Sequence, residues 1–182
     1  DPIFQPEFLL EVLKLCKENE IHTTVDTSLF TNRKVIDSII PYTDLFMVSL
    51  KHFDNEMHKK LTGVGNKQIL DNIQYLSHEI VACEGEKKHG ETKKRCPKLW
   101  LRYVVLPGYT DTKDNLKALV EFLHQINFEL IELLPYHTFG VYKWKEMGLK
   151  YALNGVKPPE HSDVLKIKKM LEKEGFKVQI TE

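Results

Sequence analysis

The chain has 182 residues, a length that suits one domain with a sizeable core. It carries 26 basic and 26 acidic side chains, and this zero net charge favours a small polar ligand over a nucleic acid or an anionic membrane. No apolar run approaches the roughly 20 residues of a membrane helix, and the three cysteines lack the spacing of a disulfide framework or a metal site. We therefore expect a cytoplasmic protein without nucleic-acid or membrane partners.

Helix and strand signals alternate along the chain. An apolar helical face follows Pro6, and residues 21–26 then predict a strand. A short helix at 32–40 ends before Pro41, and a second strand is predicted at 45–51. The same rhythm continues to the end of the chain, where we expect helices at 69–80, 112–123 and 162–174 and strands at 99–105, 130–134 and 176–180.

This alternation predicts βαβ units and therefore an α/β fold with a parallel sheet. Five strands are too few for a closed eight-stranded barrel, so the expected architecture is a partial barrel or an open sheet. The pattern begins with a helix, as though a preceding strand were missing.

Residues 82–98 interrupt the rhythm. They are rich in charged side chains and stand where a loop of about two to six residues is usual. Cys83 and Cys96 flank the segment and are compatible with metal binding or with pairing, but two cysteines are a weak signal. We interpret 82–98 as a solvated, charged insertion loop without chemistry.

Four predicted strands carry a polar side chain at or near one end, namely Asp26, Lys51, Arg102 and His137. Because parallel strands all point one way, these side chains are expected to meet at a single edge of the sheet. Asp26 suits a ligand hydroxyl, an amine or a cation, and Lys51 suits a ligand carboxylate. Arg102 lies inside a strand and must reach a carboxylate, a ligand or solvent.

Each of these residues also has a purely structural interpretation. Asp26 is compatible with capping a local turn, and Lys51 with extending from a strand end into water. Arg102 is compatible with a structural ion pair, and a single histidine such as His137 is more often structural than functional. The residue types alone therefore predict a convergent polar site without naming its ligand.

Five stretches of the chain, taken in order and spacing, resemble one known family: 22–27, 43–51, 102–108, 132–137 and 155–159. The family is that of the glycyl-radical-enzyme activating enzymes, which belong to the radical S-adenosylmethionine superfamily. The resemblance implies a single domain over 1–182 that forms a partial (β/α)6 barrel, truncated at its N-terminus. It further implies an oxidoreductase in which a 4Fe-4S cluster reduces S-adenosylmethionine, and a 5′-deoxyadenosyl radical then removes a hydrogen from a glycine of a partner enzyme.

By position, the resemblance assigns five residues to the S-adenosylmethionine site: Asp1, Asp26, Lys51, Arg102 and His137. It also implies a monovalent-cation site at Asp26, Thr27 and Met47. Ser49 stands where the family has an aspartate, and a hydroxyl is a neutral and weaker cation ligand.

The cluster-binding motif of three closely spaced cysteines is absent from the chain. We therefore expect a C-terminal fragment that is inactive alone, from a longer protein that holds the cluster. The implied partners are pyruvate formate-lyase as the glycyl radical enzyme and an electron donor such as flavodoxin or ferredoxin, and the expected state is a monomer. Two alternatives are an activase of another glycyl radical enzyme and a non-catalytic S-adenosylmethionine-binding half-barrel that has lost its cluster.

Overall fold

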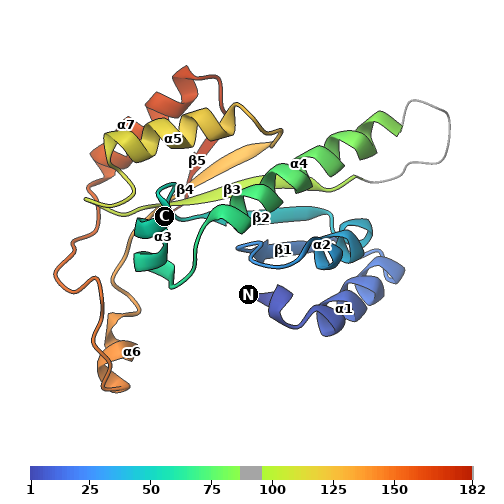
Figure 1. Cartoon of the computed structure of the whole chain (residues 1–182), viewed down its shortest axis with the longest axis horizontal. Helices are drawn as coiled ribbons and strands as arrows, with labels where there is room; N and C mark the ends of the chain where they lie inside the picture. Colours follow the sequence, from blue (N-terminus) through green and yellow to red (C-terminus); the bar gives the residue numbers. More distant parts are fainter. Residues whose placement is uncertain (87–95, 182) are drawn as a thin grey trace.

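The computed structural model describes residues 1–86 and 96–181. In these residues five strands form one parallel sheet, in the spatial order β1-β2-β3-β4-β5 (Figure 1). The strands are β1 (Thr24–Thr27), β2 (Leu45–Leu50), β3 (Lys98–Val105), β4 (Leu130–Pro135) and β5 (Val178–Ile180). The predicted alternation of helices and strands is therefore confirmed.

The helices of the described chain are α1 (Pro6–Glu18), α2 (Arg33–Ile39), α3 (Asn55–Thr62), α4 (Lys67–Glu86), α5 (Lys113–Leu123), α6 (Val141–Glu146) and α7 (His161–Lys173), with 3-10 turns at Pro2–Phe4 and Ile40–Tyr42. Side-chain caps explain two of the helix starts. Asn32 accepts a hydrogen bond from the Val35 amide before α2, and Asp54 accepts one from the Met57 amide before α3. Helix α4 is the longest, and no helix in the described ranges is long and apolar enough to cross a membrane.

Each strand neighbours the one before it in the chain, and all four pairs are parallel. Connections between parallel strands are right-handed. When the strands lie in the sheet in the same order as in the sequence, right-handed connections place all the helices on one side of the sheet. Figure 1 shows α4 and α5 along the same side of the sheet. This is the arrangement of a partial (β/α) barrel, whereas a doubly wound sheet reverses its strand order. The predicted partial barrel is confirmed.

Residues along β2 and β3 alternate between the two faces of the sheet. Buried residues such as Phe46, Val48 and Tyr103 belong to the hydrophobic core, which also contains the inward faces of α4, α5 and α7. The intervening residues, among them Ser49 and Arg102, are only partly buried and lie on the opposite face. We call this opposite, partly covered side the open face of the sheet. It carries the polar residues that sequence analysis singled out.

The expectation of a loop throughout 82–98 is wrong at both ends. Helix α4 continues to Glu86, and β3 already begins at Lys98, while residues 87–95 lie outside the described part of the chain. Cys83 and Cys96 form a disulfide with Cα atoms 5.8 Å apart, so the expectation that the segment has no chemistry is also corrected. The physical reason is that Cys83 follows Ile80 by three residues and continues the apolar side of α4 by one turn.

Candidate functional site

Arg102 on β3 lies between two carboxylates from other strands. Its Nε donates to Glu132 Oε2 at 2.7 Å, and its Nη1 donates to Asp26 Oδ2 at 2.6 Å. Asp26 belongs to β1, and the intervening strand β2 places the small Ser49 directly opposite Arg102. Because this serine is short, the guanidinium spans β2 and reaches β1. Sequence analysis left the ion pair open, and the structure shows two.

Glu132 is the site residue that sequence analysis missed. It lies directly opposite Arg102 on β4 and is 5% exposed. Its second oxygen, Oε1, accepts a hydrogen bond from Thr181 Oγ1 at 2.5 Å, so both oxygens have partners. A carboxylate inside the apolar run of β4 must find such partners, because burying it unpaired is very costly. That cost is the signal by which an acid in this apolar run could have been recognised as the partner of a cation on a neighbouring strand.

Lys51 follows β2 at the carboxyl edge of the sheet, next to the same charges. Burial lowers the pKa of Lys51 below its ordinary value, the Arg102 guanidinium lowers it further, and Asp26 partly opposes both effects. Among residues 1–86 and 96–181, no hydrogen bond or ion pair engages its ammonium. Lys51 is therefore a half-buried cation whose three donors are available to a ligand.

A cavity of about 680 Å³ opens at the carboxyl ends of β3 and β4. Arg102 and Thr181 provide polar groups in its wall, and the remaining lining is mostly apolar or aromatic: Val104, Leu134, Pro135, Tyr136, His137, Phe139 and His161. The His137 and Phe139 rings stack with centroids 4.7 Å apart. A charged wall beside stacked flat rings suits a ligand that has both charged and planar parts.

Asp1 and Thr27 lie at the end of β1. Asp1 Oδ2 accepts hydrogen bonds from the amide and the hydroxyl of Ser28, at 2.8 and 2.7 Å. Thr27 is buried, and its Oγ1 accepts from the Leu29 amide at 3.0 Å. Met47 lies opposite Asp26 in the β1–β2 register. In the described ranges no group of three His, Cys, Asp or Glu side chains is arranged around a metal position, and the monovalent-cation site stays a prediction.

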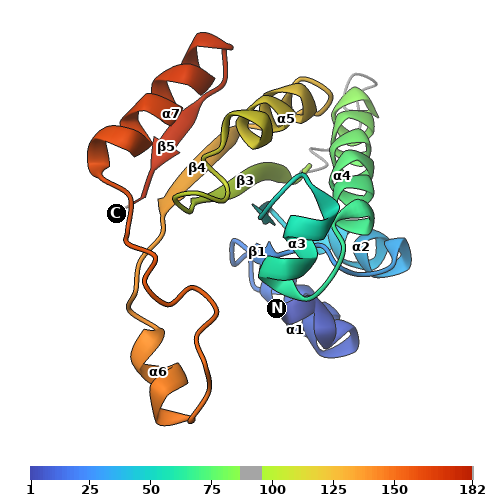
Figure 2. The same ribbon diagram turned by 60° about the vertical axis from the view of Figure 1, so that its left-hand side comes forward.

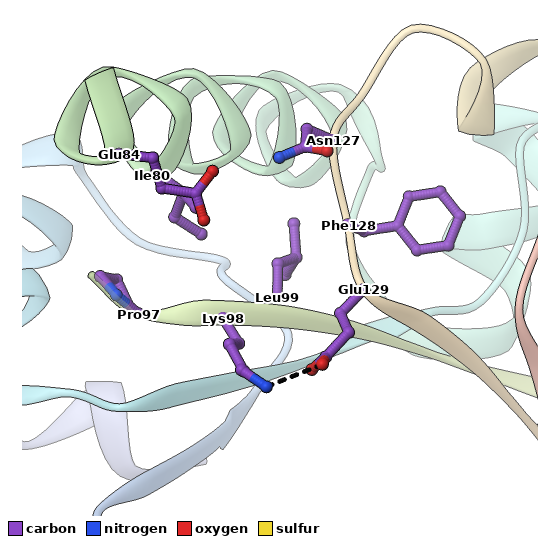
Figure 3. A pocket seen from close by; sticks show the side chains of 8 residues that line it. All are labelled: Ile80, Glu84, Pro97, Lys98, Leu99, Asn127, Phe128 and Glu129. Carbon is purple, nitrogen blue, oxygen red and sulfur yellow. Dashed lines mark hydrogen bonds and ion pairs between the residues drawn. The ribbon is translucent and has the colours of Figure 1, made fainter. Parts of the chain in front are cut away.

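A second cavity lies at the amino ends of β3 and β4, at the opposite edge of the sheet from Arg102 and Lys51 (Figure 3). Its charged groups are largely paired: Lys98 Nζ contacts Glu129 Oε1 at 2.7 Å, and Trp100 Nε1 donates to Glu129 Oε2 at 2.7 Å. These two hydrogen bonds, from Lys98 and then Trp100, lower the pKa of Glu129. Barrel enzymes place their chemistry at the carboxyl ends of the strands, so we interpret this cavity as structural.

Known proteins have sequences similar to this chain. Residues 1–84 match the model of the radical SAM superfamily. The chain is 40% identical over 181 residues to the pyruvate formate-lyase 1-activating enzyme of Escherichia coli K12, covering 98% of this chain and 67% of that protein. It is 36% identical over 184 residues to the pyruvate formate-lyase-activating enzyme of Listeria monocytogenes, covering 97% and 68%.

Solved structures extend the comparison. A domain of pyruvate-formate lyase-activating enzyme from Bacteroides vulgatus superposes with a TM-score of 0.76 and 25% identity, covering 100% of this chain and 94% of that one. Streptococcus suis SuiB, at 15% identity and a TM-score of 0.65, shares the fold. The partial barrel, together with the match over residues 1–84, thus defines a radical S-adenosylmethionine domain. More narrowly, the chain belongs to the family of pyruvate formate-lyase-activating enzymes.

Proposed function

We propose that residues 1–182 act as a single domain that binds S-adenosylmethionine in an enzyme that activates pyruvate formate-lyase. The observation that supports this most directly is the half-buried ammonium of Lys51, which forms no hydrogen bond or ion pair in the described ranges and lies beside the Asp26–Arg102 pair. A protein gains nothing in stability from such a cation, so its position is best explained by an anionic group of a ligand. The radical SAM family match supports S-adenosylmethionine as that ligand, and the names of the relatives support pyruvate formate-lyase as the protein substrate.

The residues of the open face fit the chemical groups of S-adenosylmethionine. Lys51 would hold the ligand carboxylate, while Asp26 and the segment at Asp1 would hold the amine and the ribose hydroxyls. The stacked rings of His137 and Phe139 would support the flat adenine. Apolar lining residues such as Val104 and Leu134 would keep water away from the reacting centre.

The family implies a 4Fe-4S cluster as a second cofactor. Cys83 and Cys96 are bonded to each other and Cys16 stands alone, so the described cysteines do not form a cluster site. We propose that the cluster is bound only in a longer, full-length protein. In support of this, the chain spans 67% of the length of its Escherichia coli relative. Cluster and S-adenosylmethionine together supply the one-electron chemistry that removes a hydrogen atom from a glycine of the partner.

The remaining assignments complete the proposal. Flavodoxin or ferredoxin would deliver the electron, and the protein would work as a cytoplasmic monomer. A monovalent cation would bind beside Asp26 and Thr27, with the chain around Met47 as the third element of its site.

Binding of S-adenosylmethionine to this chain tests the proposal directly. Lys51→Met should weaken binding about tenfold, because it removes a charge-assisted contact to the carboxylate. Lys34→Met is the matched control, since Lys34 is an exposed lysine on α2. Isothermal titration calorimetry measures both affinities, and equal affinities for the two variants would remove Lys51 from the site.

A second experiment tests the activity. A full-length protein with a reconstituted cluster should release 5′-deoxyadenosine and produce a glycyl radical on pyruvate formate-lyase under reducing, anaerobic conditions. If the cluster is confirmed spectroscopically and no 5′-deoxyadenosine forms, the enzyme assignment fails. A radical on another glycyl radical enzyme, but not on pyruvate formate-lyase, would change the partner.

A further inference from the structure

The segment between β4 and α7 leaves the body of the protein. Figure 2 shows α6 at the end of an extended excursion, away from the sheet and from the other helices, and Figure 1 agrees. We call residues 137–151 the aromatic arm. It begins at His137, directly after the strand end that borders the cavity.

The aromatic arm is braced by its own side chains. The Trp144 ring packs against Tyr151 with centroids 5.7 Å apart, and the Tyr151 hydroxyl is hydrogen-bonded to the Tyr136 hydroxyl at 2.7 Å. Tyr136 is buried at the base of the arm, and the Leu149 amide donates to the Trp144 carbonyl at 2.8 Å. The arm therefore has a defined fold of its own that holds its remaining side chains outward.

Five of those outward side chains are large and apolar, namely Phe139, Tyr142, Trp144, Met147 and Leu149. Phe139 is 79% exposed and Met147 60% exposed, and Tyr142 and Leu149 are also more than half exposed. Exposed apolar side chains gathered in one short segment are unusual on a soluble surface and mark sites of association. Aromatic side chains and methionine are enriched at protein interfaces relative to the rest of the surface.

The arm also carries a charge signature. Lys143, Lys145 and Lys150 are exposed beside one exposed carboxylate, Glu146, so the arm has an excess of positive charge, and within the described residues none of the three lysines forms an ion pair. A complementary surface would therefore combine apolar side chains with carboxylates.

Phe139 connects the arm to the cavity, because it lines the cavity and stacks on His137. The surface that meets a partner is thus continuous with the place where a glycine must arrive. We propose that the aromatic arm is the docking surface for the protein substrate. It binds a patch of that substrate, next to the glycine segment, in which apolar side chains lie beside carboxylates. This inference rests on the proposed function, which requires a protein substrate at this cavity.

A paired substitution on the arm tests the docking surface. Met147→Glu combined with Leu149→Glu should weaken the affinity of this chain for intact pyruvate formate-lyase at least about tenfold, by removing apolar contact and adding charge of the wrong sign. The matched control is Ile21→Glu combined with Val81→Glu, two apolar residues that are 56% and 47% exposed elsewhere on the surface. Biolayer interferometry measures the affinities, and circular dichroism confirms folding of both variants.

The outcomes separate the docking surface from the S-adenosylmethionine site. Weaker partner binding by the arm variant, with unchanged S-adenosylmethionine affinity and an unchanged control, supports the proposal. Equal partner affinity in all three proteins overturns it. If sedimentation shows that the unmodified chain self-associates and that the arm variant does not, the occupant is a second copy and the proposal is also overturned. If the chain binds pyruvate formate-lyase through the arm but does not bind S-adenosylmethionine, only the proposed cofactor site fails.

Discussion

Glu132 fixes the position of Arg102, since the two residues lie directly opposite each other on β4 and β3 and are joined by a contact of 2.7 Å. Thr181 in turn holds the other oxygen of Glu132. Arginine has five N–H donors in a rigid, planar group, so one fixed Nε contact orients all of them. Glu132 is thus a positioning residue: it acts on the site through Arg102.

The first prediction concerns this pair. Glu132→Gln removes a buried negative charge and leaves Arg102 with one carboxylate partner, Asp26, in place of two. The free energy of unfolding should therefore fall by about 2 kcal/mol. Urea denaturation measures the change. Asp26→Asn is the control, because the Asp26 side chain is 52% exposed and its loss should cost less than about 1 kcal/mol. Equal costs for the two variants would contradict the role of burial.

The second prediction concerns the stability cost of Lys51. Replacing this half-buried ammonium by the similar-sized, apolar side chain in Lys51→Met should raise the free energy of unfolding by about 1 kcal/mol at neutral pH. Because the folded pKa lies below the ordinary value of 10.5, the unfolded chain binds more protons between these two pKa values, and native stability rises with pH there. Urea denaturation at several pH values should show that this rise is absent from Lys51→Met. A destabilised variant would mean that the ammonium is satisfied in the native protein.

The third prediction concerns ligand binding and pH. The lowered pKa of Lys51 means that its positive charge is lost at a lower pH than in an ordinary lysine. Affinity for S-adenosylmethionine should therefore fall as pH rises through that pKa, because the carboxylate loses its partner. Lys51→Arg should lose less affinity over the same range, since arginine does not titrate there and only the amine of the ligand still does. Calorimetric titrations across pH decide the matter, and parallel pH profiles for the two proteins would refute it.

The fourth prediction concerns the disulfide at the end of α4. Cys83→Ser should lower the free energy of unfolding by about 3 kcal/mol without reductant, because the bond closes a loop over a sequence separation of 13 residues. Adding reductant to the unmodified protein should remove the difference. Cys16→Ser is the control, and its effect should be within about 0.5 kcal/mol. Alkylation of all three cysteines before any reduction would show that the bond is absent.

Much of the fold could be predicted because apolar periodicity reports burial. The predicted strand at 45–51 matches β2 to within one residue, and the predicted helix at 69–80 lies inside α4, which extends to Glu86. The first strand was predicted at 21–26, whereas β1 spans Thr24–Thr27. Apolar periodicity does not show the contact that delays the start of this strand. The Thr23 amide donates to the Asp44 side chain at 2.9 Å, so regular pairing begins only at Thr24.

The two helices that sequence analysis missed are too short, at eight and six residues, for a stripe of buried apolar side chains to predict them. Helix α3 depends instead on its ends, with Asp54 as the N-terminal cap and Gly63, at φ +85°, as the C-terminal cap. Helix α6 has only six residues and buries none of them. Such elements are defined by local hydrogen bonds, which a pattern of buried positions does not record.

The candidate site was predicted in part. As the positions at the strand ends predict, Arg102 and His137 line the same cavity, and Lys51 lies near Arg102 and Asp26. Glu132 was missed because the sequence does not say which residues of β3 and β4 lie opposite each other. The sequence left open whether Cys83 and Cys96 pair or bind a metal, because the choice depends on where α4 ends.

The alternation of buried and partly covered residues along β2 and β3 divides each strand between two tasks. Residues such as Val48 and Tyr103 maintain the core, while their sequence neighbours Ser49 and Arg102 contact the candidate site. A substitution on the open face changes the ligand chemistry without disturbing the packing beneath the helices. New substrate specificities can therefore evolve on this scaffold one residue at a time, with the folding core left intact.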